Sequence, residues 1–393
     1  MWRIVYVAPF GLGQKTTVWA RTLPLARYLA QQGHTVTLLI PPWDTPQDAG
    51  KRWQDEGVEV VNVSLSGGIP MIMARLLKEV RRRQPHLVHI VKPRAHAGLV
   101  QWWLWQQQRW SWGPSQKDKP KIVLDVDDWE QAWAVINPYP PPVARFLAWQ
   151  EEWGIRHAHA IIAASQWLVE RVQQYTPQTP VCYLPNGVTP LEGTDAAAPD
   201  EMGCSTPEIL FFSRYVEVTP VWLARFWGAL VQHRPDAHLT VFGDAFQPGR
   251  VQAFQQVMHQ VAERAAPRVT WLPYSAPAQA QLYRTAACAI FPAEATPLLQ
   301  AKCSVKLATT LLHGVPVVAS AVGEQAAYGA EGAAQLLPAT ATPEAFAAAV
   351  AHVLDAPAAR VQLRQQAQAR LLARYRWATL GARLESFYAQ LLA

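Results

Sequence analysis

The sequence predicts an α/β protein built from two tandem, doubly wound, Rossmann-like domains. Short apolar runs of strand length alternate with helical patterns along almost the whole chain. That alternation is typical of parallel sheets covered by helices on both faces. It is interrupted once, by a Pro- and Gly-rich acidic segment, and then it restarts. With 393 residues, half of them hydrophobic, the chain is long enough to form two cores.

The first domain is expected to span residues 1–188. Its helical stretches end at strong stop signals: residues 18–32 run into Gly33, and residues 71–84 run into Pro85. Between and beyond them lie apolar runs of the length and composition of strands. The expected strands are residues 3–8, 36–40, 58–63, 87–91, 121–126, 160–163 and 181–184.

Residues 189–206 are predicted to be a linker, because they are small, acidic and rich in Pro and Gly. The second domain is then expected to span residues 207–375, with a cleft between the two domains. The expected strands are 209–212, 239–242, 269–272, 287–291, 316–319 and 334–337. Three helices are expected to close the chain, at 342–354, 357–374 and 376–392.

Charge and tryptophan are unevenly distributed between the two halves. Residues 1–190 hold 20 Lys and Arg against 14 Asp and Glu, and they carry the whole net charge of +6. Residues 191–393 hold 15 of each. Fourteen of the 18 tryptophans also precede residue 190. This asymmetry predicts two domains with different partners.

Several classes of protein are disfavoured. The N-terminus lacks the charged and apolar regions of a signal peptide, and no apolar run approaches the length of a membrane span. The four cysteines and eleven histidines show no metal-site spacing, so the cysteines are interpreted as buried thiols of a reducing compartment. We therefore expect a cytoplasmic protein. No nucleic-acid-binding motif accompanies the basic charge.

Five short motifs carry a resemblance to a known family. Each matches one segment of the family pattern, in the family's order and spacing. They are "HAHAIIAASQWL" (157–168), "YLPNGV" (183–188), "ILFFSRY" (209–215), "HRPDAHLTVFGD" (233–244) and "KLATTLLHGVPVVASAVG" (306–323). On these motifs the chain resembles the GT-B glycosyltransferases, and most closely the retaining group 1, or family 4, enzymes.

The resemblance implies a fold, an activity and a division of labour. The second domain would hold a nucleotide diphosphate-sugar donor, and the first would hold the acceptor, a glycan, lipid-linked or other hydroxyl compound. Transfer would proceed with retention and without a metal ion or other cofactor. The last helix, in residues 376–393, would cross back to the first domain.

The donor diphosphate must be neutralised by cations and helix N-termini if no metal is used. Arg214 matches the family's diphosphate arginine, although a surface ion pair is the alternative. The lysine that the family places a few residues later is missing, and Lys302 or Lys306 is expected to replace it unless both are simply solvated. The backbone amides of Ser304 and Val305 open a predicted helix and are further phosphate ligands.

Two glutamates of the family pattern are absent. Their positions fall on Ala301 and Thr309. The second normally holds the ribose hydroxyls with charge assistance, and Thr309 offers only neutral hydrogen bonds. We expect this to weaken the ribose contact by about 1–3 kcal/mol. Glu294 lies nearby in sequence and is a catalytic candidate facing the donor sugar, with an exposed loop carboxylate as the alternative.

The loop "FGLGQKTT" (10–17) follows the first strand. Gly11 and Gly13 would let the backbone approach the donor closely, and Lys15 would lie on the acceptor side. The spacing does not fit a phosphate-binding P-loop, because Gln14 rather than Gly precedes the lysine. A plain tight turn is the alternative for the glycines.

The segment "LDVDDWE" (124–130) ends a strand with three acids. Asp127 stands where the family often has a histidine beside the reacting sugar, so it is a catalytic candidate that would orient a hydroxyl or act as a base. Asp128 is assigned to the acceptor side, with capping of the next helix as the alternative. Lys92 and Arg94 end the preceding strand and are predicted to meet an anionic acceptor.

The segment "QWWLWQQQRWSWG" (101–113) contains five tryptophans, which is dense for a core. Trp favours membrane interfaces, and a basic run at 75–83 lies nearby in sequence. Together they predict peripheral contact with an anionic membrane, at the inner face of which the protein would act. Internal packing of about half of these rings is the alternative.

Three other functions stay open from the sequence. A catalytically weakened, nucleotide-sugar-binding pseudoenzyme would explain Ala301 and Thr309. A nucleotide-sugar epimerase would share the fold. A scaffold would use the Trp-rich face alone. The sugar, the base, the acceptor and the oligomeric state do not follow from the sequence.

Overall fold

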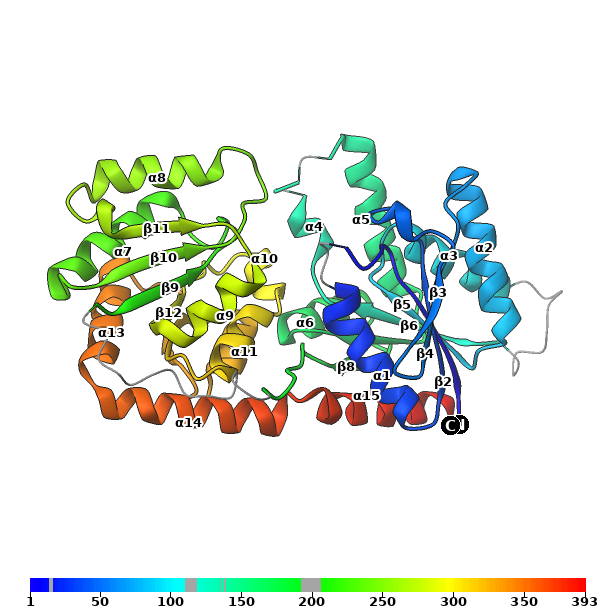
Figure 1. Ribbon diagram of the computed structural model, residues 1–393. Helices are drawn as coiled ribbons and strands as arrows, with labels where there is room; N and C mark the ends of the chain where they lie inside the picture. Colours follow the sequence, from blue (N-terminus) through cyan, green and yellow to red (C-terminus); the bar gives the residue numbers. More distant parts are fainter. Residues whose placement is uncertain (14–16, 110–118, 135, 138, 192–205) are drawn as a thin grey trace. The chain divides into compact units, whose positions relative to one another are not determined.

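The computed structural model describes residues 1–13, 17–109, 119–134, 136–137, 139–191 and 206–393. They form two compact units, Met1–Asn186 with Trp377–Ala393, and Gly187–Arg376. Both units are parallel α/β sheets with helices on their two faces (Figure 1), which confirms the predicted fold class. Most of the predicted linker, 192–205, lies outside the described residues.

In its described part, the first unit has an eight-stranded sheet with the order β3-β4-β2-β1-β5-β6-β7-β8. Every pairing is parallel except that of β3 with β4. The unpredicted strand β3 is a half-exposed edge strand whose sequence, RWQD, contains no apolar run. The strands are β1 (Arg3–Val7), β2 (Thr35–Ile40), β3 (Arg52–Asp55), β4 (Val58–Asn62), β5 (Leu87–Val91), β6 (Lys121–Val126), β7 (Ala160–Ala163) and β8 (Val181–Tyr183).

Helices cover both faces of this first sheet. On one face, Leu25 and Leu29 of α1 share a core with Leu384 and Tyr388 of α15. The C-terminal helix therefore packs on the first unit, as expected. On the other face α3 packs between α2 and α5. The helices are α1 (Leu23–Gln31), α2 (Gly68–Arg83), α3 (Ala95–Arg109), α4 (Glu130–Trp133), α5 (Pro141–Arg156), α6 (Gln166–Tyr175) and α15 (Trp377–Leu392).

The helix expected at residues 18–32 begins as a π-helical turn, Val18–Thr22, before α1. This turn places Arg21 in the core, where its guanidinium forms an ion pair with Asp125 of β6 at 2.9 Å and donates to Asn186 at 3.2 Å. His89 of β5 and Tyr388 of α15 join the same buried group through a 2.5 Å hydrogen bond. These polar contacts tie the loop after β1, the central strands and the C-terminal helix together.

The described part of the second unit has a six-stranded, fully parallel sheet with the order β11-β10-β9-β12-β13-β14. Its strands are β9 (Glu208–Phe212), β10 (His238–Phe242), β11 (Val269–Leu272), β12 (Ala286–Phe291), β13 (Val317–Ser320) and β14 (Gln335–Leu337). Each lies within one residue of its predicted position at both ends.

The core on one face of this sheet is formed by helices α7, α8 and α13, through residues such as Trp227, Phe254 and Phe346. Helices α11 and α14 also pack on each other. The helices are α7 (Pro220–His233), α8 (Arg250–Val261), α9 (Ala276–Thr285), α10 (Pro297–Ala301), α11 (Val305–Leu312), α12 (Gly323–Gly329), α13 (Pro343–Asp355) and α14 (Pro357–Arg374).

Three cysteines in the described residues, Cys182, Cys288 and Cys303, are buried thiols that form no disulfide, as the sequence predicted. None of the described helices combines the length and apolar character needed to cross a bilayer.

Candidate functional site

Cations from distant parts of the sequence meet at one edge of the second sheet. Arg214 follows β9, and Lys302 and Lys306 follow β12, the neighbour of β9 in the sheet. The carboxyl ends of parallel strands lie at the same edge, which is where α/β proteins bind ligands. The fold therefore brings the predicted donor cations together.

Glu217 lies among these cations and was not singled out in the sequence as a site residue. Its carboxylate accepts hydrogen bonds from the backbone N–H groups of Arg214 and Val216, at 3.0 and 3.1 Å, and from the Ser213 hydroxyl at 3.0 Å. The ammonium of Lys302 lies 3.6 Å away. Burial alone would raise the pKa of Glu217, but Lys302 and the backbone donors hold it below its usual range.

Lys306 is a cation of the group whose charged form is disfavoured by its surroundings. Its ammonium lies over the ring of Phe212, 5.6 Å from the centroid, and within the described residues it forms no ion pair. Burial, together with the neighbouring charges of Lys302 and Arg214, lowers the pKa of Lys306 to about 8. An anion bound here would restore the favourable environment of the ammonium.

Gly243 and Phe246 define the surroundings of Lys306 and Arg214. Gly243, directly after β10, has φ +139, and an added Cβ would collide with the carbonyl of Ser213 and lie 3.7 Å from the Lys306 ammonium. The guanidinium of Arg214 stacks on Phe246, 4.2 Å from the ring centroid. The surface ion pair considered as the alternative for Arg214 is not found among the described residues.

The remaining donor-side candidates lie on or near α10 and α11. Ser304 and Val305 begin α11, and the Ser304 hydroxyl caps it by accepting from the Leu307 N–H at 3.3 Å. Thr309 is half-buried one turn beyond Lys306. Ala301 is fully buried, so the position of the first missing glutamate is part of the core. Glu294 is exposed in the loop after β12, and no side-chain contact of it is found in the described part of the chain.

In the first unit, acids follow β6 and cations follow its neighbour β5, at the carboxyl ends of both strands. Asp127 follows β6 and accepts a hydrogen bond from Thr17 at 3.0 Å. Lys92 follows β5 and lies 3.0 Å from a carboxylate oxygen of Asp127. Burial raises the pKa of Asp127, and Lys92 opposes this shift. The protonation of this carboxyl group is therefore set by burial, which favours the neutral acid, against the charge of Lys92, which favours the carboxylate.

Lys92 and Arg94 are not free to meet an anionic acceptor as predicted. Lys92 also forms an ion pair with Glu130 at 3.0 Å, and Arg94 forms one with the same carboxylate. Burial would lower the pKa of Lys92, but Asp127 and Glu130 outweigh it and raise the pKa. The backbone of Lys92 is in the left-handed region, with φ +63, a conformation that carries strain in a non-glycine residue.

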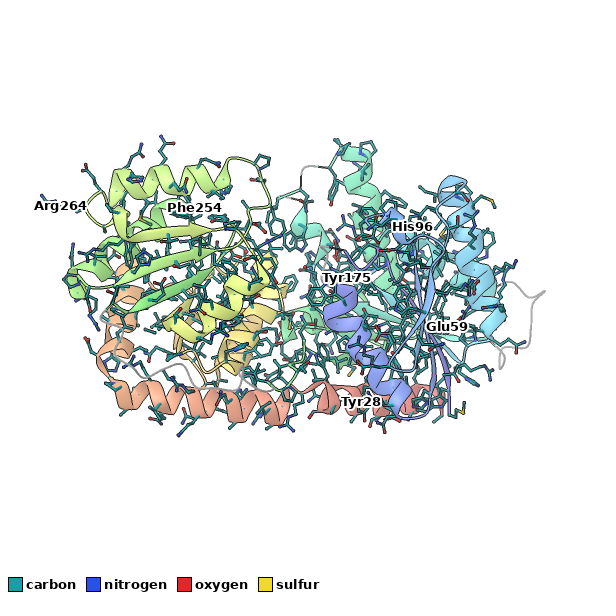
Figure 2. The ribbon with its side chains drawn as sticks, viewed as in Figure 1. Tyr28, Glu59, His96, Tyr175, Phe254 and Arg264 are labelled. Atoms are coloured by element: carbon teal, nitrogen blue, oxygen red, sulfur yellow. The ribbon has the colours of Figure 1, made fainter. Side chains whose placement is uncertain are left out.

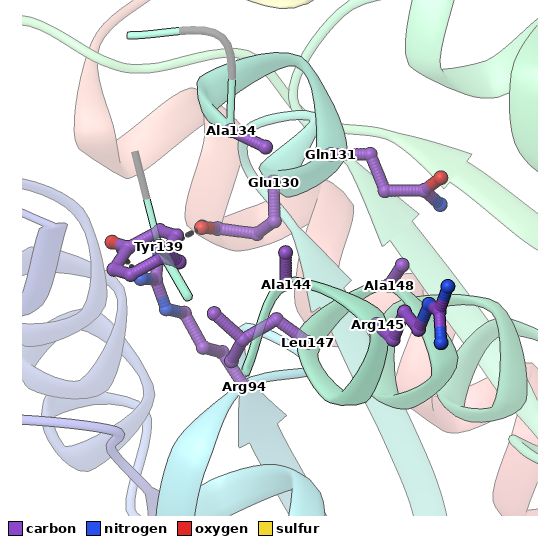
Figure 3. A pocket seen from close by; sticks show the side chains of 9 residues that line it. All are labelled: Arg94, Glu130, Gln131, Ala134, Tyr139, Ala144, Arg145, Leu147 and Ala148. Carbon is purple, nitrogen blue, oxygen red and sulfur yellow. Dashed lines mark hydrogen bonds and ion pairs between the residues drawn. The ribbon is translucent and has the colours of Figure 1, made fainter. Parts of the chain in front are cut away.

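A pocket of about 260 Å³ lies beside this ion-pair cluster, between α4 and α5. Figure 3 shows Arg94 bridging Glu130 and Tyr139 at one side of the pocket. The other lining residues are mainly small and apolar. They are Gln131, Ala134, Ala144, Arg145, Leu147 and Ala148.

Asp128 does not cap the following helix, which was the alternative to an acceptor-side role. Glu151 of α5 accepts from the backbone N–H groups of Glu130 and Gln131, at 2.7 and 3.1 Å, and so takes that position at the start of α4. The Asp128 carboxylate instead accepts hydrogen bonds from the backbone N–H of Trp129, at 3.1 Å, and from the side chain of Trp133. Burial raises its pKa to about 6.

The glycines of the loop after β1 serve local packing. A Cβ at Gly11 or Gly13 would meet the side chains of Asp44 and Thr45, and the Gly11 N–H donates to Asp44 at 2.5 Å. The space on the Cβ side of both glycines is therefore filled by the chain itself. Lys15 lies outside the described residues.

The Trp-rich segment is only partly described. Trp105 of α3 packs against His157 and His159, whereas Trp103 is 36% exposed. Trp110 and Trp112 lie outside the described residues. A second apolar row was not predicted: Val143, Phe146 and Trp149 of α5 are each 42–43% exposed.

Part of the basic run on α2 is neutralised. Arg83 pairs with Glu59 at 2.7 Å and also with Glu79, and Arg82 pairs with Glu79 at 3.2 Å. Figure 2 labels Glu59 on its strand. The cation Arg75 donates to the carbonyl of Ser64 at 2.9 Å. The charge available to an anionic surface is therefore smaller than the sequence suggested.

The chain matches two family models. Residues 16–187 match the model described as a glycosyl transferase 4-like domain, and residues 206–356 match glycosyl transferases group 1. A search of curated proteins gave no match. Together the two family models span most of both units.

Solved structures with the same fold cover nearly the whole chain. A sucrose-phosphate synthase from Thermosynechococcus elongatus is 16% identical, with a TM-score of 0.72, and the match covers 100% of this chain and 99% of that one. A glycosyltransferase from Rickettsia africae is 13% identical, with a TM-score of 0.68 and coverage of 100% and 98%.

A third similar structure is Anabaena HepE in complex with UDP-glucose. It is 14% identical, with a TM-score of 0.67, and the match covers 99% of this chain and 100% of that one. The order of the two matched domains and the shared architecture agree with the motifs in the sequence. The chain therefore consists of a glycosyl transferase 4-like domain followed by a glycosyl transferases group 1 domain, and it has the GT-B fold.

Proposed function

We propose that the protein transfers a glycosyl group from a nucleotide diphosphate-sugar to a hydroxyl acceptor, a glycan or a lipid-linked compound, with retention of configuration and without a metal ion or other cofactor. The observation that carries the proposal is the cluster of Arg214, Lys302 and Lys306, in which Lys306 has a pKa lowered to about 8 by burial and by the other two cations. Such a cluster is suited to a diphosphate, since cations can supply the charge stabilisation that a metal would otherwise provide.

A candidate for the donor nucleotide comes from a similar structure. HepE, which has the same fold, was solved with UDP-glucose, so a uridine nucleotide is the first donor to test. Ser304 and Val305 would present backbone amides at the start of α11, and Thr309 would contact the ribose. Glu294 would face the sugar hydroxyls from its exposed loop.

The acceptor is assigned to the first unit. Asp127 would orient the acceptor hydroxyl or take its proton, since burial raises its pKa and so makes its carboxylate a stronger base than an exposed aspartate. Lys92 would act as a positioning residue for Asp127 rather than as an acceptor ligand. The pocket beside Arg94 and Tyr139 would accommodate an uncharged part of the acceptor, because its lining is largely apolar.

A peripheral contact with an anionic membrane is part of the same proposal, and it would place the protein at the inner face of the membrane. Trp103 of α3 and the α5 row of Val143, Phe146 and Trp149 support it, because exposed aromatic and aliphatic side chains suit the interfacial region. A lipid-linked acceptor would then be reached at the surface.

The direct test is a donor-hydrolysis and transfer assay with a panel of nucleotide sugars, including UDP-glucose, in the presence and absence of EDTA. We expect release of the nucleoside diphosphate that is insensitive to EDTA, and a product with the anomeric configuration of the donor by NMR. An isomerised nucleotide sugar would indicate an epimerase instead. Binding of nucleotide sugars without any turnover would indicate a pseudoenzyme.

A further inference from the structure

The loop after β9 is arranged like an anion-binding site, and the carboxylate of Glu217 from the same loop occupies it. After β9, the N–H groups of Arg214 and Val216 and the hydroxyl of Ser213 converge on one carboxylate at 3.0–3.1 Å. Successive backbone N–H groups arranged in this way form a concave site for anions. The loop conformation includes Tyr215 at φ +61, which an L-residue adopts rarely.

The same carboxylate belongs to the cation cluster. Lys302 lies 3.6 Å from Glu217, and Glu217 and Asp244 are the two acids that act on Lys306. Asp244 follows β10 and accepts from the Tyr274 N–H at 3.2 Å. Three cations therefore share the sheet edge with two acids, and Glu217 is the acid bound directly among them.

We propose that Glu217 is a built-in counter-charge that makes the donor site discriminate between the nucleotide sugar and the free nucleoside diphosphate. The inference rests on the proposed function. A nucleotide diphosphate-sugar carries about two negative charges, and the released diphosphate carries about three near neutral pH, because a terminal phosphate loses its second proton at about pH 6. Repulsion from a fixed carboxylate grows with the charge of the ligand.

The consequence concerns product release. A site with three uncompensated cations would hold the more highly charged product more tightly than the substrate. The Glu217 carboxylate weakens both ligands but weakens the product more, so it favours departure of the nucleoside diphosphate after transfer. Glu217 is on this view a residue that sets ligand selectivity, without contact with the reacting atoms.

The test is the exchange Glu217→Gln, which keeps an oxygen acceptor for the loop N–H groups and removes the charge. Calorimetry would measure UDP, UDP-glucose and inorganic pyrophosphate with each variant. We expect UDP to bind about 5–20-fold more tightly and UDP-glucose about 2–5-fold more tightly than with the wild type. Inorganic pyrophosphate should also gain, and product inhibition by UDP should become stronger.

Two control variants separate charge from structure. Glu217→Asp keeps the charge and shortens the side chain, so the ratio of UDP to UDP-glucose affinity should stay near the wild-type value. Glu344→Gln removes an exposed acid that pairs with Arg225 on the same unit, and it should change none of the three affinities. Circular dichroism and thermal unfolding would verify that each variant is folded.

If Glu217→Gln does not fold, Lys302→Met perturbs the same ion pair by removing its cation instead of its acid. Removal of this cation leaves Glu217 unpaired, so UDP should weaken more than UDP-glucose. A ratio of the two affinities that stays at the wild-type value in this variant would overturn the proposal.

The outcomes distinguish the inference from the proposed function. Unchanged or weaker binding of pyrophosphate and UDP by a folded Glu217→Gln protein would overturn the proposed role of Glu217 as a counter-charge. Glu217 would then serve only the structure of the loop. Tighter pyrophosphate binding with no binding of either nucleotide would overturn the proposed donor and support the counter-charge. Equal gains for UDP and UDP-glucose would overturn the discrimination.

Discussion

The carboxyl edges of the two sheets hold similar charged side chains, but the two edges differ in whether the lysine there has ion-pair partners. In the first unit, Lys92 lies between Asp127 and Glu130, 3.0 Å from each. In the second unit, Lys306 forms no ion pair within the described residues, and burial and neighbouring cations depress its pKa. A buried cation with two partners is a structural element, whereas one without a partner is ready for an external anion.

The net charge of each half of the sequence does not predict this difference between the two sheet edges. The net charge of +6 lies entirely in the first 190 residues, yet the cations at the sheet edge there are paired. The second half is neutral overall, yet at its sheet edge Arg214 and Lys306 have no ion-pair partner within the described residues. The local arrangement, and not the net charge of a domain, decides where an anionic ligand is expected to bind.

The strongest test of this difference replaces the lysine at each sheet edge by methionine. Lys92→Met should lower the free energy of unfolding by about 3–5 kcal/mol, because it leaves buried carboxylates without their cation. Lys306→Met should leave stability unchanged or raise it, since it removes a half-buried charge that has no ion-pair partner among the described residues. Urea denaturation followed by circular dichroism would measure both. If Lys92→Met is as stable as the wild type, the first cluster is not the structural one.

Arg214→Ala should weaken binding of the nucleoside diphosphate by about 1.5–3 kcal/mol, the range for hydrogen bonds to charged groups. Calorimetry with UDP and GDP would measure the effect. Arg225→Ala is the control, because this exposed cation pairs with Glu344 away from the sheet edge and should change affinity by less than about 0.5 kcal/mol. Equal affinities for wild type and Arg214→Ala would remove Arg214 from the site.

The pKa of Lys306, lowered to about 8, gives the second unit a distinct pH dependence. The ammonium loses its proton as pH rises through this value, so UDP affinity should fall by about two- to tenfold between pH 7 and 9. Stability of the free protein should instead rise over the same interval, because the unfolded lysine keeps its proton up to a higher pH. Lys306→Arg should flatten the affinity profile, since arginine stays charged.

Membrane binding extends the comparison to the exposed surface of the first unit. Because cations of α2 are paired with Glu59 and Glu79, sedimentation with anionic liposomes should depend on the apolar row and only modestly on salt. Phe146→Ser with Trp149→Ser should reduce binding about tenfold. Val221→Ser with Val261→Ser in the second unit is the matched control. A wild type that stays in the supernatant at low salt would end the membrane proposal.

The smallest effect is expected at the ribose position. Thr309→Glu should raise nucleotide affinity several-fold by restoring a charge-assisted bond to the ribose hydroxyls. Thr309→Val, which keeps the shape and removes the hydroxyl, should lower it slightly. A direct binding constant is needed beside KM, because KM alone also reflects turnover. A loss of tenfold or more in Thr309→Glu would show that the pocket is arranged around the threonine.

The amino-acid sequence by itself determined the two-unit fold, most strand and helix positions, and the helix that returns to the first unit. These follow from periodicity and from stop signals such as Gly33, because buried parallel strands require continuous apolar runs. The sequence also identified Arg214, Lys302 and Lys306 as candidates. It missed β3, whose polar edge sequence has no apolar run, and the π-helical turn that carries Arg21 into the core.

Only the tertiary structure decided which of these charges are compensated. Lys92 and Glu130 lie 38 residues apart and Glu217 and Lys302 lie 85 apart, and both pairs meet because parallel strands bring their carboxyl ends to one edge. No spacing rule predicts such a meeting, since each pair depends on strand order and on the loop that follows. For the same reason Gly11 and Gly13 suggested a ligand loop in the sequence, whereas folding fills that space with Asp44 and Thr45.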